Sequence, residues 1–252
     1  KRDAKQYFMK FDSSVKSNDL EEIGTVGKRN TGTLIKFTPD AQFFDSVKFS
    51  IKKLRHNLRS KAVLCPGLEV NFKNEIDETE DKWLFKEGIK DYLQASLDGL
   101  DCVPSIPFVA SFKTKEEQLD CALTWTENSS NVTTESFVNL IPTIGGGTHV
   151  NGLRSGLTDA LKEFCEFRNL IPKNIKLTPD DVWQRIAYVL SIKILDPQFS
   201  GQTKERLSSR ECASFVSSVV KDSFSLWLNQ HTDIAEKIAE LAILNAQSRL
   251  KT

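Results

Sequence analysis

The sequence contains no long apolar run. No window approaches the roughly 18 consecutive apolar residues that a membrane-spanning helix requires, so no membrane segment is predicted. Residues 1–5, which read Lys-Arg-Asp-Ala-Lys, lead into no apolar signal core, so no targeting segment is expected. The chain does not begin with Met and starts in a β-rich run, which suggests a piece of a longer protein.

An excess of charge of one sign is also absent. Lys plus Arg number 34 and Asp plus Glu number 34, so no net field draws the chain towards nucleic acid. Any contact with DNA must come from a local basic patch or from a partner. The 252 residues allow one large or two small domains, and a composition of 39% apolar and 27% charged residues is typical of a soluble globular protein.

Cysteine and histidine are scarce. The five cysteines are scattered without a CxxC or a Cys/His cluster, which argues against a disulfide framework and a metal site. Buried, reduced thiols of a cytosolic protein are expected instead. None of the three histidines lies near a nucleophile elbow, which disfavours Ser/His/Asp or Cys/His catalysis. The carboxylates at residues 78–81 fit a solvated hairpin tip better than an acid/base pair.

Hydrophobic periodicity predicts an α+β protein. Strands are expected at residues 6–11, 20–26, 31–37, 68–72, 82–86, 108–112, 119–126, 136–141 and 188–195. Helices are expected at residues 50–65, 89–97, 148–170, 208–228 and 233–249. A short helix should also start at Thr178, where a hydroxyl cap precedes Pro179 and two acids. A domain boundary is predicted near residues 38–50.

One candidate for chemistry is the loop Gln202-Thr203-Lys204, between a predicted strand and a predicted helix. The Lys204 ammonium can act as a point charge for a phosphate oxygen, and the Gln202 amide can orient a water molecule. A solvated polar turn has the same composition, so spacing alone leaves both interpretations open.

A second candidate is the Gly-Gly-Gly-Thr turn at residues 145–148, which opens a predicted helix. Such turns can offer backbone N–H groups to a phosphate, or they can simply allow a tight turn. The turn lacks the spacing of a P-loop and the downstream acid of a dinucleotide fingerprint. Arg154 lies two helical turns further along the same face, and an arginine in that position is usually solvated.

Long motifs in a fixed order carry a family resemblance. They lie at residues 27–33, 61–67, 138–143, 146–154 and 196–210. On these motifs the chain resembles the ATPase subunits of bacterial type IIA topoisomerases, the family of ParE of topoisomerase IV and of DNA gyrase B. Residues 64–67 and 205–210 are more similar to ParE. The resemblance covers nearly the whole chain.

The resemblance implies a fold. Residues 1–40 would be the last strands of a GHKL ATPase sheet. Residues 41–230 would form a transducer domain with a left-handed βαβ crossover, similar to the second domain of a small-subunit ribosomal protein. Residues 231–252 would be a C-terminal helix that leads towards a TOPRIM domain.

The resemblance also implies roles for single residues. Lys204 and Gln202 would contact the γ-phosphate of ATP, and Gln202 could also contact the attacking water, which fits phosphoryl-transfer logic. Thr33 would help to fix the adenine through a water, and Arg154 would line the cavity through which DNA passes. Gly145 stands where relatives carry an acid or Gln, which should loosen that turn.

The family's catalytic Glu, Mg²⁺-binding Asn, adenine-binding Asp and lid lie upstream of Thr33. This chain alone is therefore expected to be inactive, and no metal ligand is assigned to it. The implied function is the coupling of ATP binding and hydrolysis to DNA strand passage, in a cytoplasmic, ATP-dependent type II topoisomerase that uses Mg²⁺. The implied partners are a second copy of the subunit, the ParC subunit in a heterotetramer, and DNA. Two alternatives remain: the equivalent region of gyrase B, or an interaction domain without a catalytic role.

Overall fold

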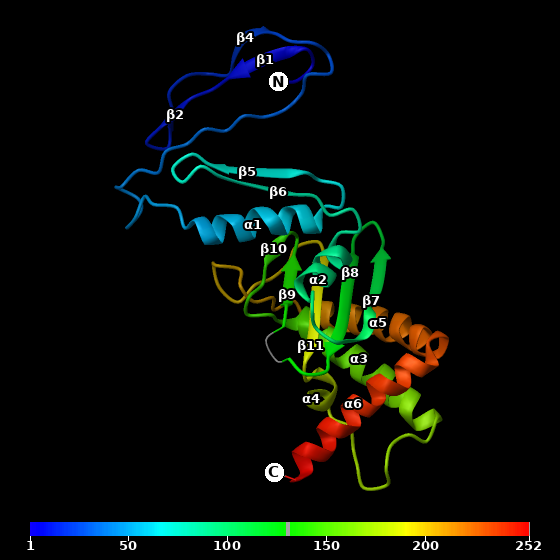
Figure 1. Ribbon diagram of the computed structural model, residues 1–252. Coiled ribbons are helices and arrows are strands. Elements are labelled where there is room, and N and C mark those ends of the chain that lie inside the picture. Colours follow the sequence, from blue (N-terminus) through cyan, green and yellow to red (C-terminus); the bar gives the residue numbers. More distant parts are fainter. Residues whose placement is uncertain (130–131, 252) are drawn as a thin grey trace. The chain divides into compact units, whose positions relative to one another are not determined.

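The computed structural model describes residues 1–129 and 132–251, so Thr252 of the predicted C-terminal helix lies outside the described residues. The chain divides into two compact units, Lys1–Leu54 and Arg55–Thr252. Helices and strands are mixed along the chain, which confirms the α+β class (Figure 1). No helix among the described residues is both long enough and apolar enough to span a membrane. The three-part domain division stays a prediction.

The first unit contains two small antiparallel pairs. They are β1 (Lys5–Phe8) with β4 (Glu21–Thr25), and β2 (Phe11–Asp12) with β3 (Val15–Lys16). The strand predicted at residues 31–37 is wrong, since these residues form no strand and the side chains of Leu34 and Ile35 are exposed. A β-rich sequence becomes a strand only when a neighbour pairs with its backbone, and within the first unit no described strand does so.

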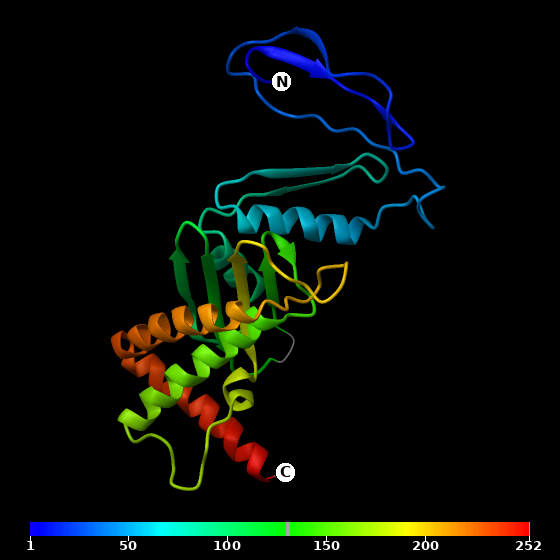
Figure 2. The same ribbon diagram turned by 180° about the vertical axis from the view of Figure 1, so that it is seen from behind.

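The second unit is built on a five-stranded sheet with the order β10-β9-β11-β8-β7. The strands are β7 (Cys102–Lys113), β8 (Gln118–Thr126), β9 (Thr134–Val138), β10 (Ile141–Pro142) and β11 (Ile186–Lys193). β9 and β11 are parallel neighbours, and the chain joins them through α3 (Thr148–Phe167) and α4 (Pro179–Trp183). In Figure 1 β11 lies to the right of β9 with α3 behind the sheet, and Figure 2 shows α3 in front. The crossover is therefore left-handed, as the family resemblance implies.

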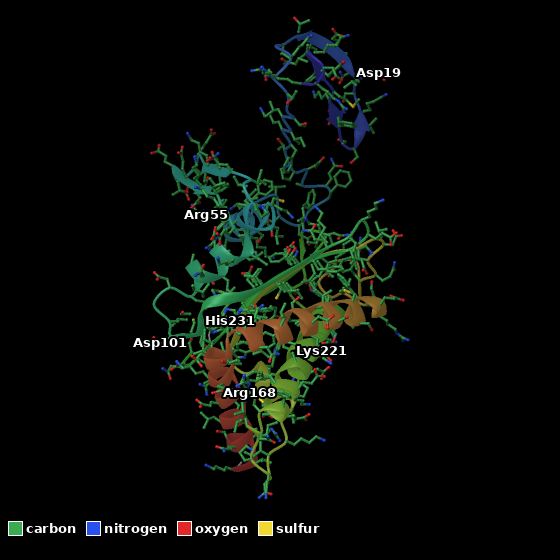
Figure 3. All side chains as sticks on the ribbon, turned by 90° about the vertical axis from the view of Figure 1, so that its right-hand side faces the viewer. Asp19, Arg55, Asp101, Arg168, Lys221 and His231 are labelled. Carbon is green, nitrogen blue, oxygen red and sulfur yellow. The ribbon has the colours of Figure 1, made fainter. Side chains whose placement is uncertain are left out.

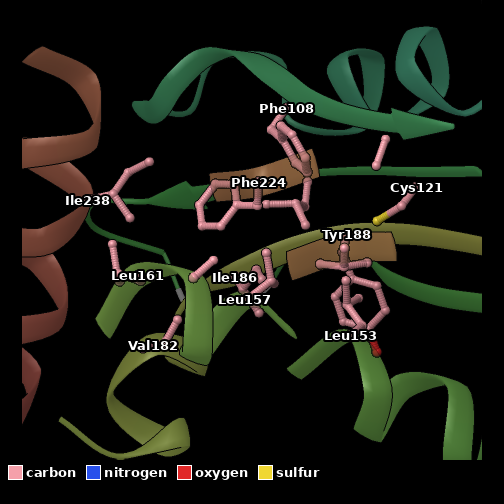
Figure 4. Close-up of a cluster of buried hydrophobic side chains, with 14 of the residues drawn as sticks. Phe108, Cys121, Leu153, Leu157, Leu161, Val182, Ile186, Tyr188, Phe224 and Ile238 are labelled. Carbon is pink, nitrogen blue, oxygen red and sulfur yellow. The ribbon is translucent and has the colours of Figure 1, made fainter. Parts of the chain in front are cut away.

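Strand alternation gives the sheet two buried faces. Along β8, Leu119, Cys121, Leu123 and Trp125 face one core, and the intervening Ala122 faces the other. The first core is closed by α3, α5 (Arg210–Gln230) and α6 (Thr232–Lys251), and Figure 4 shows part of it. The second core is closed by α1 (Ile51–Leu64) and α2 (Ile89–Ser96). Burial on both faces explains why β8 and β11 are almost continuously apolar.

A hairpin of β5 (Val70–Asn74) and β6 (Thr79–Trp83) packs beside α1. Arg55 of α1 holds it, with its Nε 2.7 Å from Asp81 and its Nη2 donating to Thr79 Oγ1 at 2.8 Å. Glu80 pairs with Lys73 at 3.1 Å on the neighbouring strand. Glu80 and Asp81 thus form ion pairs from within strand β6, whereas the sequence interpretation placed them at a solvated hairpin tip. Glu78 does lie in the exposed turn between β5 and β6.

Helices α3 and α5 approach each other more closely than side chains would allow. A Cβ atom at Gly152 would lie 2.5 Å from the Ala213 carbonyl oxygen, and one at Gly156 would lie 2.6 Å from that of Ser217. At the surface, Lys221 Nζ of α5, labelled in Figure 3, contacts a Glu163 carboxylate oxygen of α3 at 2.6 Å. Because backbone meets backbone along this seam, the two helices form one rigid pair.

Candidate functional site

Gln202, Thr203 and Lys204 lie in the loop between β11 and α5, as predicted, and all three are exposed. Gly201 and Lys204 have positive φ angles of 109° and 57°, which turns the chain sharply at the tip. The Lys204 ammonium lies 6.0 Å from the centre of the Phe199 ring. The tip thus exposes an ammonium and an amide to solvent, and both groups can donate hydrogen bonds to a phosphate.

The two arms of this loop close on each other. Phe199 and Leu207 form an antiparallel bridge, and the Ser208 N–H donates to the Gln198 carbonyl at 2.8 Å. The Gln198 N–H in turn donates to Ser209 Oγ at 2.9 Å. Ser209 is the N-cap residue of α5, so the base of the loop is joined directly to the start of that helix.

The base is also clamped to the glycine turn that opens α3. The Gly145 N–H donates to the Glu205 carbonyl at 2.9 Å, and the Thr148 N–H donates to the Leu207 carbonyl at 3.1 Å. The Leu207 N–H donates back to the Gly146 carbonyl at 3.0 Å. Two amides that could have cradled a phosphate are thus already used. The structure supports the tight-turn interpretation for residues 145–148.

Gly147 allows this clamp sterically. Its φ is 131°, and a Cβ atom there would lie 2.2 Å from the Leu207 carbonyl oxygen. Gly145, which was expected to loosen the turn, is held at both ends, because its carbonyl accepts a bond from Arg206 Nη1 at 3.0 Å and its N–H is bound as above. The turn is therefore fixed to the loop by backbone contacts.

Sequence reasoning missed a buried polar cluster next to this turn. His149 is fully buried, and its Nε2 lies 3.0 Å from Thr143 Oγ1, which lies 2.7 Å from Ser136 Oγ. Burial lowers the pKa of His149 to about 4, so the ring is neutral at pH 7. No local pattern could have revealed the cluster, because only the β9–β10 hairpin brings Ser136 to Thr143.

Arg154 is engaged by an acidic residue of α4. Its guanidinium pairs with Asp180 and lies 5.9 Å from the centre of the Trp183 ring, and its side chain is 33% exposed. The adjacent Asp181 is buried and binds Nε and Nη2 of Arg249 of α6, both at 2.9 Å. The role of Arg154 in a DNA cavity stays a prediction; in this structure its partner is a carboxylate.

Thr33 belongs to the first unit. It lines an open depression together with Lys28, Thr31 and residues 1–4. Gln202, Lys204 and Arg154 belong to the second unit. No group of three or more His, Cys, Asp or Glu side chains that could hold a metal ion occurs among residues 1–129 and 132–251.

Comparison with known proteins decides the family. The family model of DNA gyrase B matches residues 88–252. The chain belongs to the DNA gyrase B family. The family resemblance predicted from the motifs is thereby confirmed.

Within this family, the chain is highly similar to several topoisomerase IV proteins and less similar to a gyrase protein. It is 54% identical over 251 residues to the B subunit of DNA topoisomerase 4 from Salmonella typhimurium, covering 100% of this chain and 40% of that protein. The corresponding protein of Pseudomonas aeruginosa is 56% identical, with the same coverage of both proteins. The B subunit of DNA gyrase from Helicobacter pylori is 30% identical over 250 residues, which cover 99% of this chain and 32% of that protein.

The solved structures agree. The topoisomerase IV ATP binding domain of Francisella tularensis matches with a TM-score of 0.83 and 41% identity, over 99% of this chain and 68% of that chain. The chain spans about 40% of the length of the curated topoisomerase IV proteins that it matches.

Proposed function

We propose that this chain is the transducer region of the ATP-hydrolysing subunit of a topoisomerase IV, with residues 1–40, 41–230 and 231–252 divided as the family resemblance implies. In this role it couples ATP binding and hydrolysis to strand passage, so that the whole enzyme, an isomerase, decatenates and relaxes DNA. The 54% identity to a topoisomerase IV protein, against 30% to a gyrase protein, favours this function over that of gyrase.

The nucleotide contacts are Lys204 and Gln202 at the loop tip and Thr33 in the first unit. Lys204 supplies positive charge to the γ-phosphate, and Gln202 binds the same group or orients the attacking water. Thr33 helps to hold the adenine through a water. Mg²⁺ supplies further charge neutralisation when bound, and its ligands lie outside this chain. The exposed ammonium and amide on a closed, anchored loop fit such a role.

The observation that carries the coupling is the double attachment of the loop. Its base is bonded to the N-cap Ser209 of α5 and to residues 145–148 at the start of α3. Those two helices are locked together at Gly152 and Gly156. Loss of the γ-phosphate would release the tip, and the resulting shift would pass to the helix pair as a unit, which is a hinge-type transition.

The proposed partners are a second copy of the subunit, ParC in a heterotetramer, and DNA, all in the cytoplasm. Arg154 is proposed to line the DNA cavity, where a backbone phosphate would replace Asp180 as its partner.

The test is substitution of Lys204 by Ala in the full-length subunit assembled with ParC, with Lys173→Ala as a matched control in another exposed loop. Lys204→Ala should lower ATP turnover about 100-fold, abolish supercoil relaxation and leave the melting temperature unchanged. Unchanged turnover would instead favour an interaction domain without a catalytic role. Introduction of negative supercoils by the wild-type enzyme would favour gyrase.

A further inference from the structure

A chain of three buried side chains lies next to the turn that clamps the loop. It runs from His149 in the first turn of α3 to Thr143 and then to Ser136 of β9. These side chains are 0%, 2% and 7% exposed, respectively. Buried polar groups are tolerated only when they are bonded to each other, so the geometry of such a chain is tightly specified.

The protons of the chain can be placed by counting donors. Ser136 Oγ donates its single proton to the Thr143 carbonyl at 3.1 Å. The Thr143 hydroxyl therefore donates to Ser136 Oγ, and His149 donates from Nε2 to Thr143 Oγ1. This leaves Nδ1 of His149 as a bare lone pair, buried without a partner among the described residues. The opposite direction would leave a buried N–H without an acceptor, which is less favourable.

The hydrogen-bonded series of His149, Thr143 and Ser136 connects to the backbone contacts between residues 145–148 and 205–207. The Thr143 carbonyl accepts both the Ser136 hydroxyl and the Gly146 N–H, the latter at 2.9 Å, and the Thr143 N–H donates to the Ser136 carbonyl at 2.8 Å. The Gly146 carbonyl then accepts the Leu207 N–H at 3.0 Å. An unbroken series of hydrogen bonds and peptide units thus leads from His149 to the base of the loop.

We infer that His149, Thr143 and Ser136 are positioning residues for the nucleotide-contacting loop. They fix the turn at residues 145–147, and the turn holds the base of the loop. The position of the base then determines where Lys204 lies relative to the γ-phosphate. None of the three touches nucleotide. This inference rests on the proposed function of Lys204, but its first step, the positioning of the loop base, can be measured without nucleotide.

The variants change one hydroxyl at a time in the full-length subunit. Thr143→Val removes the hydroxyl while keeping the shape, and Thr143→Ser keeps the hydroxyl. Thr124→Val is the matched control, because the Thr124 hydroxyl is equally buried and bonds to the Pro104 carbonyl at 2.6 Å. His149→Gln keeps an N–H donor near the position of Nε2, and His149→Leu removes it.

The first measurement is hydrogen–deuterium exchange of the backbone amides of Leu207, Ser208 and Thr148. Thr143→Val and His149→Leu should raise their exchange about tenfold, and Thr143→Ser and Thr124→Val should leave it within about twofold of wild type. Equal rates in Thr143→Val and Thr124→Val would overturn the inference. If Thr143→Val does not fold, Thr143→Ser and the His149 pair decide it: equal exchange in His149→Gln and His149→Leu would overturn the inference.

The second measurement compares two nucleotides. Thr143→Val should weaken binding of a non-hydrolysable ATP analogue about tenfold and leave ADP binding unchanged, because ADP lacks the phosphate that Lys204 contacts. A merely destabilised protein would lose affinity for both, and that result would overturn the inference. If Lys204→Ala leaves ATP turnover unchanged, the proposed contact of Lys204 with the γ-phosphate is wrong. The exchange measurement still tests whether His149 and Thr143 position the base of the loop.

Discussion

The Leu207 N–H donates to the Gly146 carbonyl at 3.0 Å, and so joins the start of α5 to the start of α3 across 61 residues of sequence. The two helices are also packed backbone to backbone at Gly152 and Gly156. The base of the loop that carries Gln202 and Lys204 is therefore attached to both helices of a rigid pair.

Substitution of Gly147 by Ala should break this attachment. The new methyl group would lie 2.2 Å from the Leu207 carbonyl oxygen, at a φ of 131°. We expect the free energy of unfolding to fall by about 3 kcal/mol or more, because both overpacking and backbone strain oppose the methyl group. Gly99→Ala is the control: its φ is 79° but it has open space, so it should cost only about 1 kcal/mol in urea denaturation. Equal losses would show that the contact with Leu207 is unimportant.

Substitution of Gly152 by Ala tests the helix seam. Ala is a better helix former than Gly by about 1 kcal/mol, so an exposed site would gain stability. At Gly152 the methyl group would lie 2.5 Å from the Ala213 carbonyl oxygen. We expect a net loss of about 1–2 kcal/mol, because the overpacking outweighs the propensity. Ser155→Ala, on the exposed face of the same helix, should be neutral or slightly stabilising. A gain at Gly152 would contradict the close packing.

The acid stability of the second unit should depend on His149. Its pKa is lowered from 6.5 to about 4 in the folded state, so the unfolded state binds more protons between these values. The free energy of unfolding therefore has its full value, as far as His149 is concerned, above pH 6.5. It falls as the pH drops towards 4, by up to about 3 kcal/mol, because the unfolded state takes up the proton first. His149→Gln should flatten the unfolding free energy measured over this range. A slope that is identical in wild type and variant would show that His149 does not titrate with unfolding.

Substitution of Asp180 by Asn should free Arg154 for a phosphate. The two side chains form an ion pair and Asp180 is largely exposed. If Arg154 lines the proposed DNA cavity, this carboxylate would compete with a DNA phosphate for the guanidinium. We expect binding of a short duplex by the assembled enzyme to strengthen up to about fivefold, since exposed pairs are worth up to about 1 kcal/mol. Arg154→Ala should cancel the gain. Asp98→Asn makes the same charge change elsewhere, and an equal gain there would show that only net charge matters.

The sequence was informative wherever a local pattern decides the structure. The helix start at Thr178 is confirmed, with Asp181 Oδ2 accepting the Thr178 N–H at 2.7 Å in a capping box. The predicted strand at residues 31–37 is wrong because strand formation depends on a neighbour, and no strand of the first unit pairs with it in the described structure. The residues around Thr178 were thus sufficient to predict the helix start, whereas residues 31–37 needed a pairing partner that their own composition does not encode.

The candidate site was predictable only at its tip. Gln202 and Lys204 stand in a loop that composition and motif both indicate. The backbone contacts between residues 145–148 and 205–207 join distant segments. The hydrogen-bonded series from His149 to Ser136 also depends on how the β9–β10 hairpin folds. No periodicity encodes such contacts. The sequence alone therefore could not decide whether the glycine turn at residues 145–148 is a phosphate cradle or only a tight turn.

The most direct test of the role of Lys204 is the preference of the full-length subunit for a triphosphate over a diphosphate. The affinities for a non-hydrolysable ATP analogue and for ADP should be measured by calorimetry in wild type and in Lys204→Ala. We predict that Lys204→Ala removes most of the preference by weakening the analogue alone, with ADP binding unchanged. A preference that survives the substitution intact would contradict a contact between this loop and the γ-phosphate.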